Sequence, residues 1–98
     1  MCGIVGYTGA KDVGQLLLDS LELLEHRGYD SVGIACFEKE TDKVGIQKCV
    51  GRVRDLRAEC EENKMISNCG IGHTRWATHG GVYTKNAHPH RCGKVTLV

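Results

Sequence analysis

The sequence predicts an α+β fold in a single domain. Apolar residues follow a helical period in two segments, and they alternate or cluster over strand-length runs elsewhere. The expected elements succeed one another as strand, helix, hairpin, helix, strand, loop and strand, which is typical of layered α+β domains. No linker, repeat or low-complexity segment divides the 98 residues, and a chain of this length forms one domain at most.

The first elements are a predicted strand and helix. Residues 1–7 are expected to form a glycine-containing strand. From Val13 onward apolar residues recur at helical spacing, with Asp12 as the N-cap and Gly28 as the C-terminal stop. Leu18 falls outside the apolar face, so we expect it to be exposed or covered by a part of the protein beyond these residues.

A hairpin and a second helix follow. The apolar run 31–37 predicts a buried strand, and a polar turn leads to its partner at 44–50. Residues 52–63 carry a narrow apolar stripe and predict a short helix with one packed face. Arg57 and Glu61 are spaced to pair on its solvent side.

The C-terminal third is a strand at 69–75, an irregular stretch at 76–93 and a strand at 94–98 that has no evident partner. Long irregular loops are usually functional or disordered. This one is rich in side chains suited to binding: Arg75, Trp76, Thr78, His79, Asn86, His88 and His90. Composition alone leaves two interpretations open, a binding loop that closes on a ligand and a surface loop whose tryptophan fills a gap.

Composition excludes several classes of protein. The net charge of +1 argues against a nucleic-acid partner or an acidic membrane surface. No apolar run is long enough to cross a membrane, and no leader of the signal-peptide kind is present. We therefore expect a cytoplasmic protein whose six cysteines are reduced.

The cysteines and histidines suggest an alternative, a small metal-binding or interaction module. Its best candidate ligands are His88, His90 and Cys92, which alternate along an extended segment. The spacing does not favour it, because the sequence has no Cys-x-x-Cys and no obvious fourth ligand. The other internal cysteines lie in apolar patterns and are expected to be small core residues.

Cys2 has two interpretations. It is either an ordinary apolar residue at the start of a strand or, once Met1 is removed, an N-terminal nucleophile. In the second case the free α-amine accepts the thiol proton, directly or through one water, so that one residue supplies both nucleophile and base.

Four stretches together favour the second interpretation: CGIVGY at 2–7, EHRGYDSVGIA at 25–35, GIGHTRWATHG at 70–80 and NAHPH at 86–90. In this order they resemble the glutaminase domain of class II glutamine amidotransferases, in particular that of the glutamine–fructose-6-phosphate amidotransferases (glucosamine-6-phosphate synthases). The resemblance covers essentially the whole chain. It implies an N-terminal-nucleophile (Ntn) hydrolase fold, a four-layer α/β/β/α sandwich, of which residues 1–98 are the N-terminal part.

The resemblance also implies an activity and a site. The family hydrolyses the side-chain amide of glutamine and supplies ammonia for converting fructose 6-phosphate to glucosamine 6-phosphate. By resemblance Cys2 is the nucleophile, and Arg75 binds the α-carboxylate of glutamine. Thr78 and His79 help to hold the substrate, and Trp76 closes over the site. We expect no metal or cofactor, and we expect a homo-oligomer.

Two further residues and several departures complete the comparison with the family. Arg27 matches an arginine near the nucleophile, and His88 is a candidate for a supporting role beside the site. A Gly-Val pair stands at 81–82, where the family often has a proline close by. The Asn-Gly pair of the oxyanion hole and the aspartate that binds the α-amine lie beyond residue 98 in the family. We therefore expect the 98-residue chain to be inactive or impaired and to self-associate.

Overall fold

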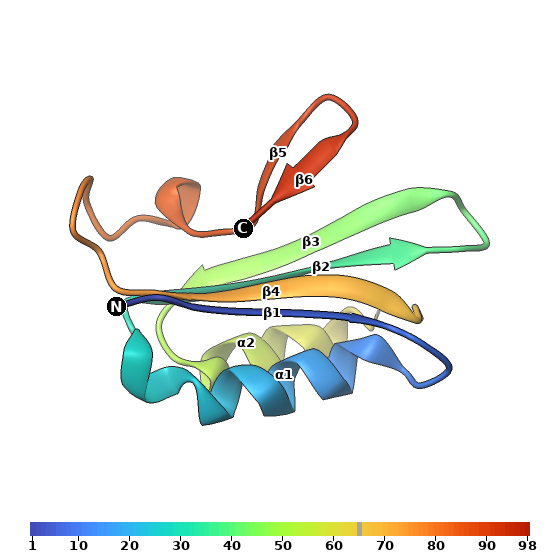
Figure 1. Ribbon diagram of the computed structural model, residues 1–98, viewed down its shortest axis with the longest axis horizontal. Helices are drawn as coiled ribbons and strands as arrows, with labels where there is room; N and C mark the ends of the chain where they lie inside the picture. Colours follow the sequence, from blue (N-terminus) through green and yellow to red (C-terminus); the bar gives the residue numbers. More distant parts are fainter. Residues whose placement is uncertain (65) are drawn as a thin grey trace.

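The computed structural model describes residues 1–64 and 66–98. Two helices cover one face of a four-stranded antiparallel sheet, and a small hairpin lies over the opposite face (Figure 1). The strands of the large sheet are β1 (Gly3–Thr8), β2 (Ser31–Glu38), β3 (Lys43–Val50) and β4 (Cys69–Arg75), and the helices are α1 (Val13–Leu23) and α2 (Val53–Glu62). The hairpin pairs β5 (His90–Cys92) with β6 (Val95–Leu97). The α+β prediction is confirmed.

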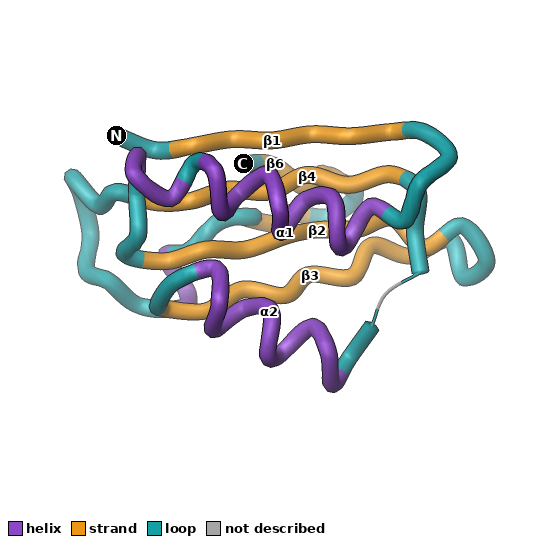
Figure 2. Tube along the Cα trace, turned by 90° about the horizontal axis from the view of Figure 1, so that it is seen from below, coloured by secondary structure: helices purple, strands orange, loops and turns teal. Residues whose placement is uncertain are grey.

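The strand order is β1-β4-β2-β3, so the last long strand inserts between the first and the second (Figure 2). Gly3 is paired with Thr74, and Ser31 with Arg75. The start of β1 and the end of β4 therefore lie side by side. This register brings Cys2 next to the loop that follows Arg75, although more than 70 positions separate them in the sequence.

The core lies between the sheet and the helices. Asp12 caps α1 as predicted, because its Oδ1 accepts a hydrogen bond from the backbone N–H of Gly14 at 3.3 Å. Leu17 and Leu21 of α1 are fully buried, as is Leu56 of α2. None of the described helices is long and apolar enough to span a membrane.

Two expectations about the helices were wrong. Leu18 is 4% exposed and belongs to the core, because α2 packs beside α1 and widens the buried stripe. Arg57 does not pair with Glu61 along its own helix. It reaches α1 instead, where its Nη2 lies 2.7 Å from Asp19 Oδ1 and 3.2 Å from Glu22 Oε2.

Three further expectations differ from the structure: the end of the first helix, the irregularity of segment 76–93 and the missing partner of the C-terminal strand. The α-helix stops at Leu23 and continues as a 3₁₀ turn, Glu25–Arg27, for which Gly28 is the C-cap. The segment 76–93 is not irregular throughout, because it contains a 3₁₀ turn (Thr84–Asn86) and β5. β5 supplies the partner that the C-terminal strand lacked in the sequence analysis.

Leu21→Ala is expected to lower the free energy of unfolding by about 2–5 kcal/mol, because it opens a cavity in the fully buried core. Urea denaturation followed by circular dichroism measures this loss. Leu23→Ala is the matched control on the same helix: Leu23 is 79% exposed, so its truncation should change stability by about 0.5 kcal/mol or less. Equal losses in the two variants would contradict the assignment of the core.

Candidate active site

One pocket, of about 460 Å³, lies where β1 begins and β4 ends. It is lined by Cys2, Arg75, Trp76, Thr78, His79, Gly80, Asn86, His88 and His90. The structure thus brings together the nucleophile candidate and the four candidate substrate-binding residues from opposite ends of the chain. Among the lining residues none carries a carboxylate, so the fixed charge of the pocket comes from Arg75.

Cys2 contacts the loop through its sulfur. The backbone N–H of Trp76 donates to Cys2 Sγ at 3.3 Å. Arg27 lies beside this residue and contacts its backbone: its Nε donates to the carbonyl oxygen of Cys2 at 2.9 Å. Its Nη2 lies 3.1 Å from Met1 Sδ. Because Cys2 follows Met1 in this chain, its nitrogen is a peptide amide and not a base.

Arg75 is 7% exposed and holds the loop beyond it in shape. Its Nη2 donates to the carbonyl oxygen of His79 at 2.6 Å and its Nη1 to that of Gly81 at 3.0 Å. Asn86 Nδ2 donates to the same Gly81 oxygen at 3.0 Å. Among the described residues no carboxylate forms an ion pair with Arg75. A guanidinium has more N–H donors than these two bonds use, so it can still accept a carboxylate ligand.

The turn that precedes β2 anchors the start of the loop. Asp30 Oδ2 accepts a hydrogen bond from the backbone N–H of Ala77 at 2.7 Å, and the N–H of Asp30 donates to the carbonyl oxygen of Arg75 at 3.0 Å. A side chain at Gly28 would place its Cβ 2.6 Å from the carbonyl carbon of Arg75, so only glycine permits this approach. The RGYDS stretch contributed to the family resemblance. Its role in anchoring the loop after Arg75 was not predicted, because that role arises from the pairing of β2 with β4.

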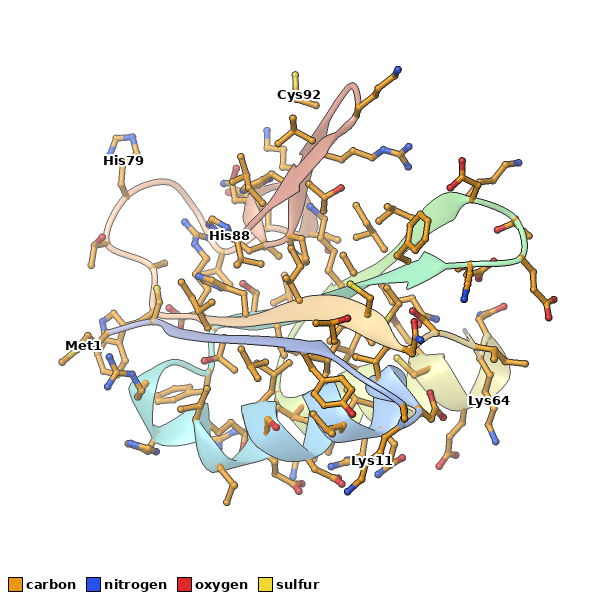
Figure 3. All side chains as sticks on the ribbon, turned by 45° about the vertical axis from the view of Figure 1, so that its right-hand side comes forward. Met1, Lys11, Lys64, His79, His88 and Cys92 are labelled. Atoms are coloured by element: carbon orange, nitrogen blue, oxygen red, sulfur yellow. The ribbon has the colours of Figure 1, made fainter. Side chains whose placement is uncertain are left out.

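Aromatic contacts hold Trp76. Its ring meets the edge of Tyr29 at 5.7 Å between centroids and an interplanar angle of 74°, and the Arg52 guanidinium lies 4.8 Å from the Tyr29 ring centroid. Trp76 is nevertheless 44% exposed. Figure 3 shows His79 at the outer turn of the loop, at the same end of the molecule as Met1. In this structure the loop is therefore anchored at its base while its outer turn is open to solvent.

Three histidine rings form a cluster at one wall of the pocket, where His88 and His90 are lining residues. The rings of His73 and His88 lie 4.1 Å apart at 20°, and those of His88 and His90 lie 4.4 Å apart at 62°. Burial, helped by the neighbouring His88, Arg75 and His90, lowers the pKa of His73 to about 4. Burial, with the same kind of neighbours, also lowers the pKa of His88. Both rings are therefore neutral near pH 7.

The metal-module alternative gains no support from this geometry. Among the described residues no three His, Cys, Asp or Glu side chains are placed to hold a metal ion. Cys92 is exposed and lies on the hairpin away from His88 (Figure 3). His88 stacks on His73 and meets His90 edge-on, and these contacts do not include Cys92.

The buried His73 predicts a loss of stability in acid. Its pKa is about 4 in the folded chain and about 6.5 when unfolded, so the unfolded chain binds more protons between these values. Above pH 6.5 His73 is neutral in both states and does not lower the free energy of unfolding. As the pH falls toward 4, the free energy of unfolding decreases by up to about 3 kcal/mol. Denaturation at several pH values measures it. His73→Phe should flatten the pH dependence, whereas His26→Phe, at an exposed position, should leave it intact; equal profiles for wild type and His73→Phe would contradict the prediction.

Comparison with solved structures defines the class of protein. The chain superimposes on a glutamine phosphoribosylpyrophosphate amidotransferase from B. subtilis, solved with ADP and GMP, with a TM-score of 0.75 and 25% identity over 96% of this chain and 20% of that one. It also matches the allosteric regulatory enzyme of purine biosynthesis with a TM-score of 0.68 and 30% identity, over 91% of this chain and 18% of that one. The fold is that of the Ntn-type glutamine amidotransferases.

Sequence comparison then identifies the particular relatives. The chain is 48% identical over 97 residues to the isomerising glutamine–fructose-6-phosphate aminotransferase of Clostridium tetani, and 54% identical over 100 residues to that of Bacillus licheniformis. These matches cover 99% and 100% of this chain, and the chain spans 16% of the length of each relative. No family model matches the chain. Over its whole length the chain is thus homologous to a segment of these aminotransferases, which confirms the resemblance seen in the four motifs.

Proposed function

We propose that residues 1–98 are part of the glutaminase domain of an isomerising glutamine–fructose-6-phosphate aminotransferase. The observation that carries this proposal is the pocket in which Cys2 meets Arg75, Trp76, Thr78 and His79. The complete enzyme takes ammonia from glutamine and uses it to make glucosamine 6-phosphate from fructose 6-phosphate. The rest of the same polypeptide supplies the sugar-phosphate chemistry. It works as a cytoplasmic homo-oligomer, with no nucleic-acid or membrane partner.

The reaction at Cys2 is acyl transfer to a thiol. After removal of Met1, the α-amine of Cys2 accepts the thiol proton and the sulfur attacks the side-chain amide carbon of glutamine. The tetrahedral intermediate breaks its C–N bond, and ammonia leaves with the proton returned by the amine. Water then attacks the thioester carbon, which releases glutamate and restores the thiol. Cys2 thus supplies the nucleophile for thioester formation and the amine that takes up and returns the proton, and water is the nucleophile for thioester hydrolysis.

Recognition of glutamine rests on the charge of the pocket. Arg75 is a buried cation without a carboxylate partner among the described residues. The α-carboxylate of glutamine would supply that partner through a charge-assisted pair. Because Arg75 also holds the carbonyls of His79 and Gly81, the same guanidinium links substrate binding to the shape of the loop. We expect Trp76, at the base of this loop, to cover a bound ligand.

The test labels the nucleophile in the complete enzyme that carries these residues. A glutamine analogue with an electrophilic diazoketone in place of the amide is incubated with the enzyme, and the adduct is mapped by mass spectrometry. We expect one adduct, on Cys2 with a free α-amine, and protection by glutamine. The D-enantiomer of the analogue is the control for non-specific alkylation, and the five other cysteines of this chain are internal controls. An adduct elsewhere, or stoichiometric zinc held by His88, His90 and Cys92, would contradict the proposal.

A further inference from the structure

Lys48 lies on β3, outside the pocket, and its ammonium group holds the backbone that carries His88. Its Nζ donates to the carbonyl oxygen of Ala87 at 2.8 Å and to that of Pro89 at 3.1 Å. No ion pair with a carboxylate is formed by Lys48 in the part of the chain that the structure describes. The ammonium is therefore committed to two backbone oxygens on either side of His88. We propose that Lys48 is a positioning residue for the glutamine site.

The segment 87–89 rests on three neighbouring strands of the sheet. β3 contributes Lys48, and β4 contributes the ring of His73 stacked on His88. β2 contributes Gly33, where any Cβ would collide with the carbonyl oxygen of His88. Ala87 and Pro89 are fully buried. The segment is thus fitted against the sheet face opposite the helices (Figure 1), and Lys48 supplies its polar attachment.

This attachment fixes one wall of the pocket. His88 and His90 line the pocket, and Asn86, immediately before the segment, holds the carbonyl of Gly81 together with Arg75. A shift of the segment would therefore move both the histidine wall and the loop that Arg75 supports. Cys2 lies before β1, and β4 and β2 separate β1 from β3, which carries Lys48. Loss of Lys48 should accordingly weaken glutamine binding and leave the nucleophile in place.

The charge of Lys48 acts on His88 as well. Burial is the main cause of the lowered pKa of His88, and Lys48 adds to it together with His90 and Arg75. The groups that face His88 from the elements packed against it, His73 and Lys48 from the sheet and His90 and Arg75 from the pocket, are all neutral or cationic. A cation at position 48 therefore helps to keep His88 neutral, so that Arg75 remains the site for a carboxylate.

The test compares three variants of the complete enzyme. Lys48→Met keeps the length of the side chain but removes its donors. We expect the Michaelis constant for glutamine to rise about tenfold, from loss of hydrogen bonds made by a charged donor, with kcat changed by less than about twofold. Lys48→Arg retains a cationic donor and should restore most of the affinity. Lys43→Met, at an exposed position on the same strand, is the matched control and should behave as wild type.

The Michaelis-constant measurements rest on the proposed function. A second measurement does not depend on it. Hydrogen exchange of a peptide covering residues 84–92, without any ligand, should be faster in Lys48→Met than in wild type or Lys43→Met. Unchanged exchange would show that Lys48 does not hold the segment, and faster exchange with an unchanged Michaelis constant would show that the segment does not shape the glutamine site. Either result overturns the inference. If wild type itself releases no glutamate from glutamine, the proposed function fails, and the exchange experiment still decides whether Lys48 holds the segment.

Discussion

Cys2→Ser in the complete enzyme is expected to lower glutamine-dependent turnover by about 10³-fold or more. A serine hydroxyl retains the size of the thiol but is much harder to deprotonate by an α-amine. The contact with the Trp76 N–H can still form, so the fold should survive. Glutamate release under saturating glutamine measures the loss. Cys92→Ser, at an exposed position on the hairpin, is the matched control, and comparable losses in the two variants would exclude Cys2 as the nucleophile.

The proposed mechanism also requires removal of Met1. While Met1 is present, the nitrogen of Cys2 is an amide that cannot accept a proton. Met1 also contacts Arg27, because the Nη2 of Arg27 lies 3.1 Å from the Met1 sulfur. Enzyme in which the initiator methionine is retained, for example by inserting a bulky residue between Met1 and Cys2, should be inactive. Removal of both residues before Cys2 should restore glutamate release. Full activity with an intact N-terminal extension would contradict the role of the α-amine.

Arg75→Lys is expected to raise the Michaelis constant for glutamine by about 30-fold to 1,000-fold or more. The estimate corresponds to about 2–5 kcal/mol for loss of one partner in a buried charge pair. Lysine keeps the positive charge but cannot make the planar two-pronged contact with a carboxylate. It also cannot hold the carbonyl oxygens of His79 and Gly81 in the same way. Steady-state kinetics with glutamine and with a glutamine analogue lacking the α-carboxylate checks the prediction: the substitution should raise the Michaelis constant much less for the analogue than for glutamine.

Two further variants separate recognition of the carboxylate from support of the loop. Asn86→Ala removes only the second hydrogen bond to the Gly81 oxygen, so it should raise the Michaelis constant much less than Arg75→Lys. Arg54→Lys, at an exposed position on α2, is a control for the substitution itself. An unchanged Michaelis constant in Arg75→Lys, or an equal rise in Asn86→Ala, would count against the assignment of Arg75 to the substrate carboxylate.

Local sequence patterns predicted most of the secondary structure, because hydrophobic period and capping are short-range properties. The Asp12 cap, the 31–50 hairpin and the strand at 69–75 needed only neighbouring residues to be recognised. Leu18 and Arg57 were misjudged because each depends on the packing of α2 against α1, which no single helix reveals. The pairing of 90–92 with 95–97 was missed because β5 is only three residues long and follows a loop rich in polar side chains.

The sequence by itself determined the fold class, the family resemblance and the residue types of the candidate site, since these are encoded in short contiguous motifs. Only the tertiary structure decided how the site is assembled. Insertion of β4 between β1 and β2 places Cys2 beside Trp76 and Asp30 beside Ala77. Docking of residues 87–89 on the open face of the sheet gives Lys48 and Gly33 their roles. These contacts join residues that are 39 to 74 positions apart in the sequence. Such long-range contacts depend on the register of the whole sheet and not on any local pattern.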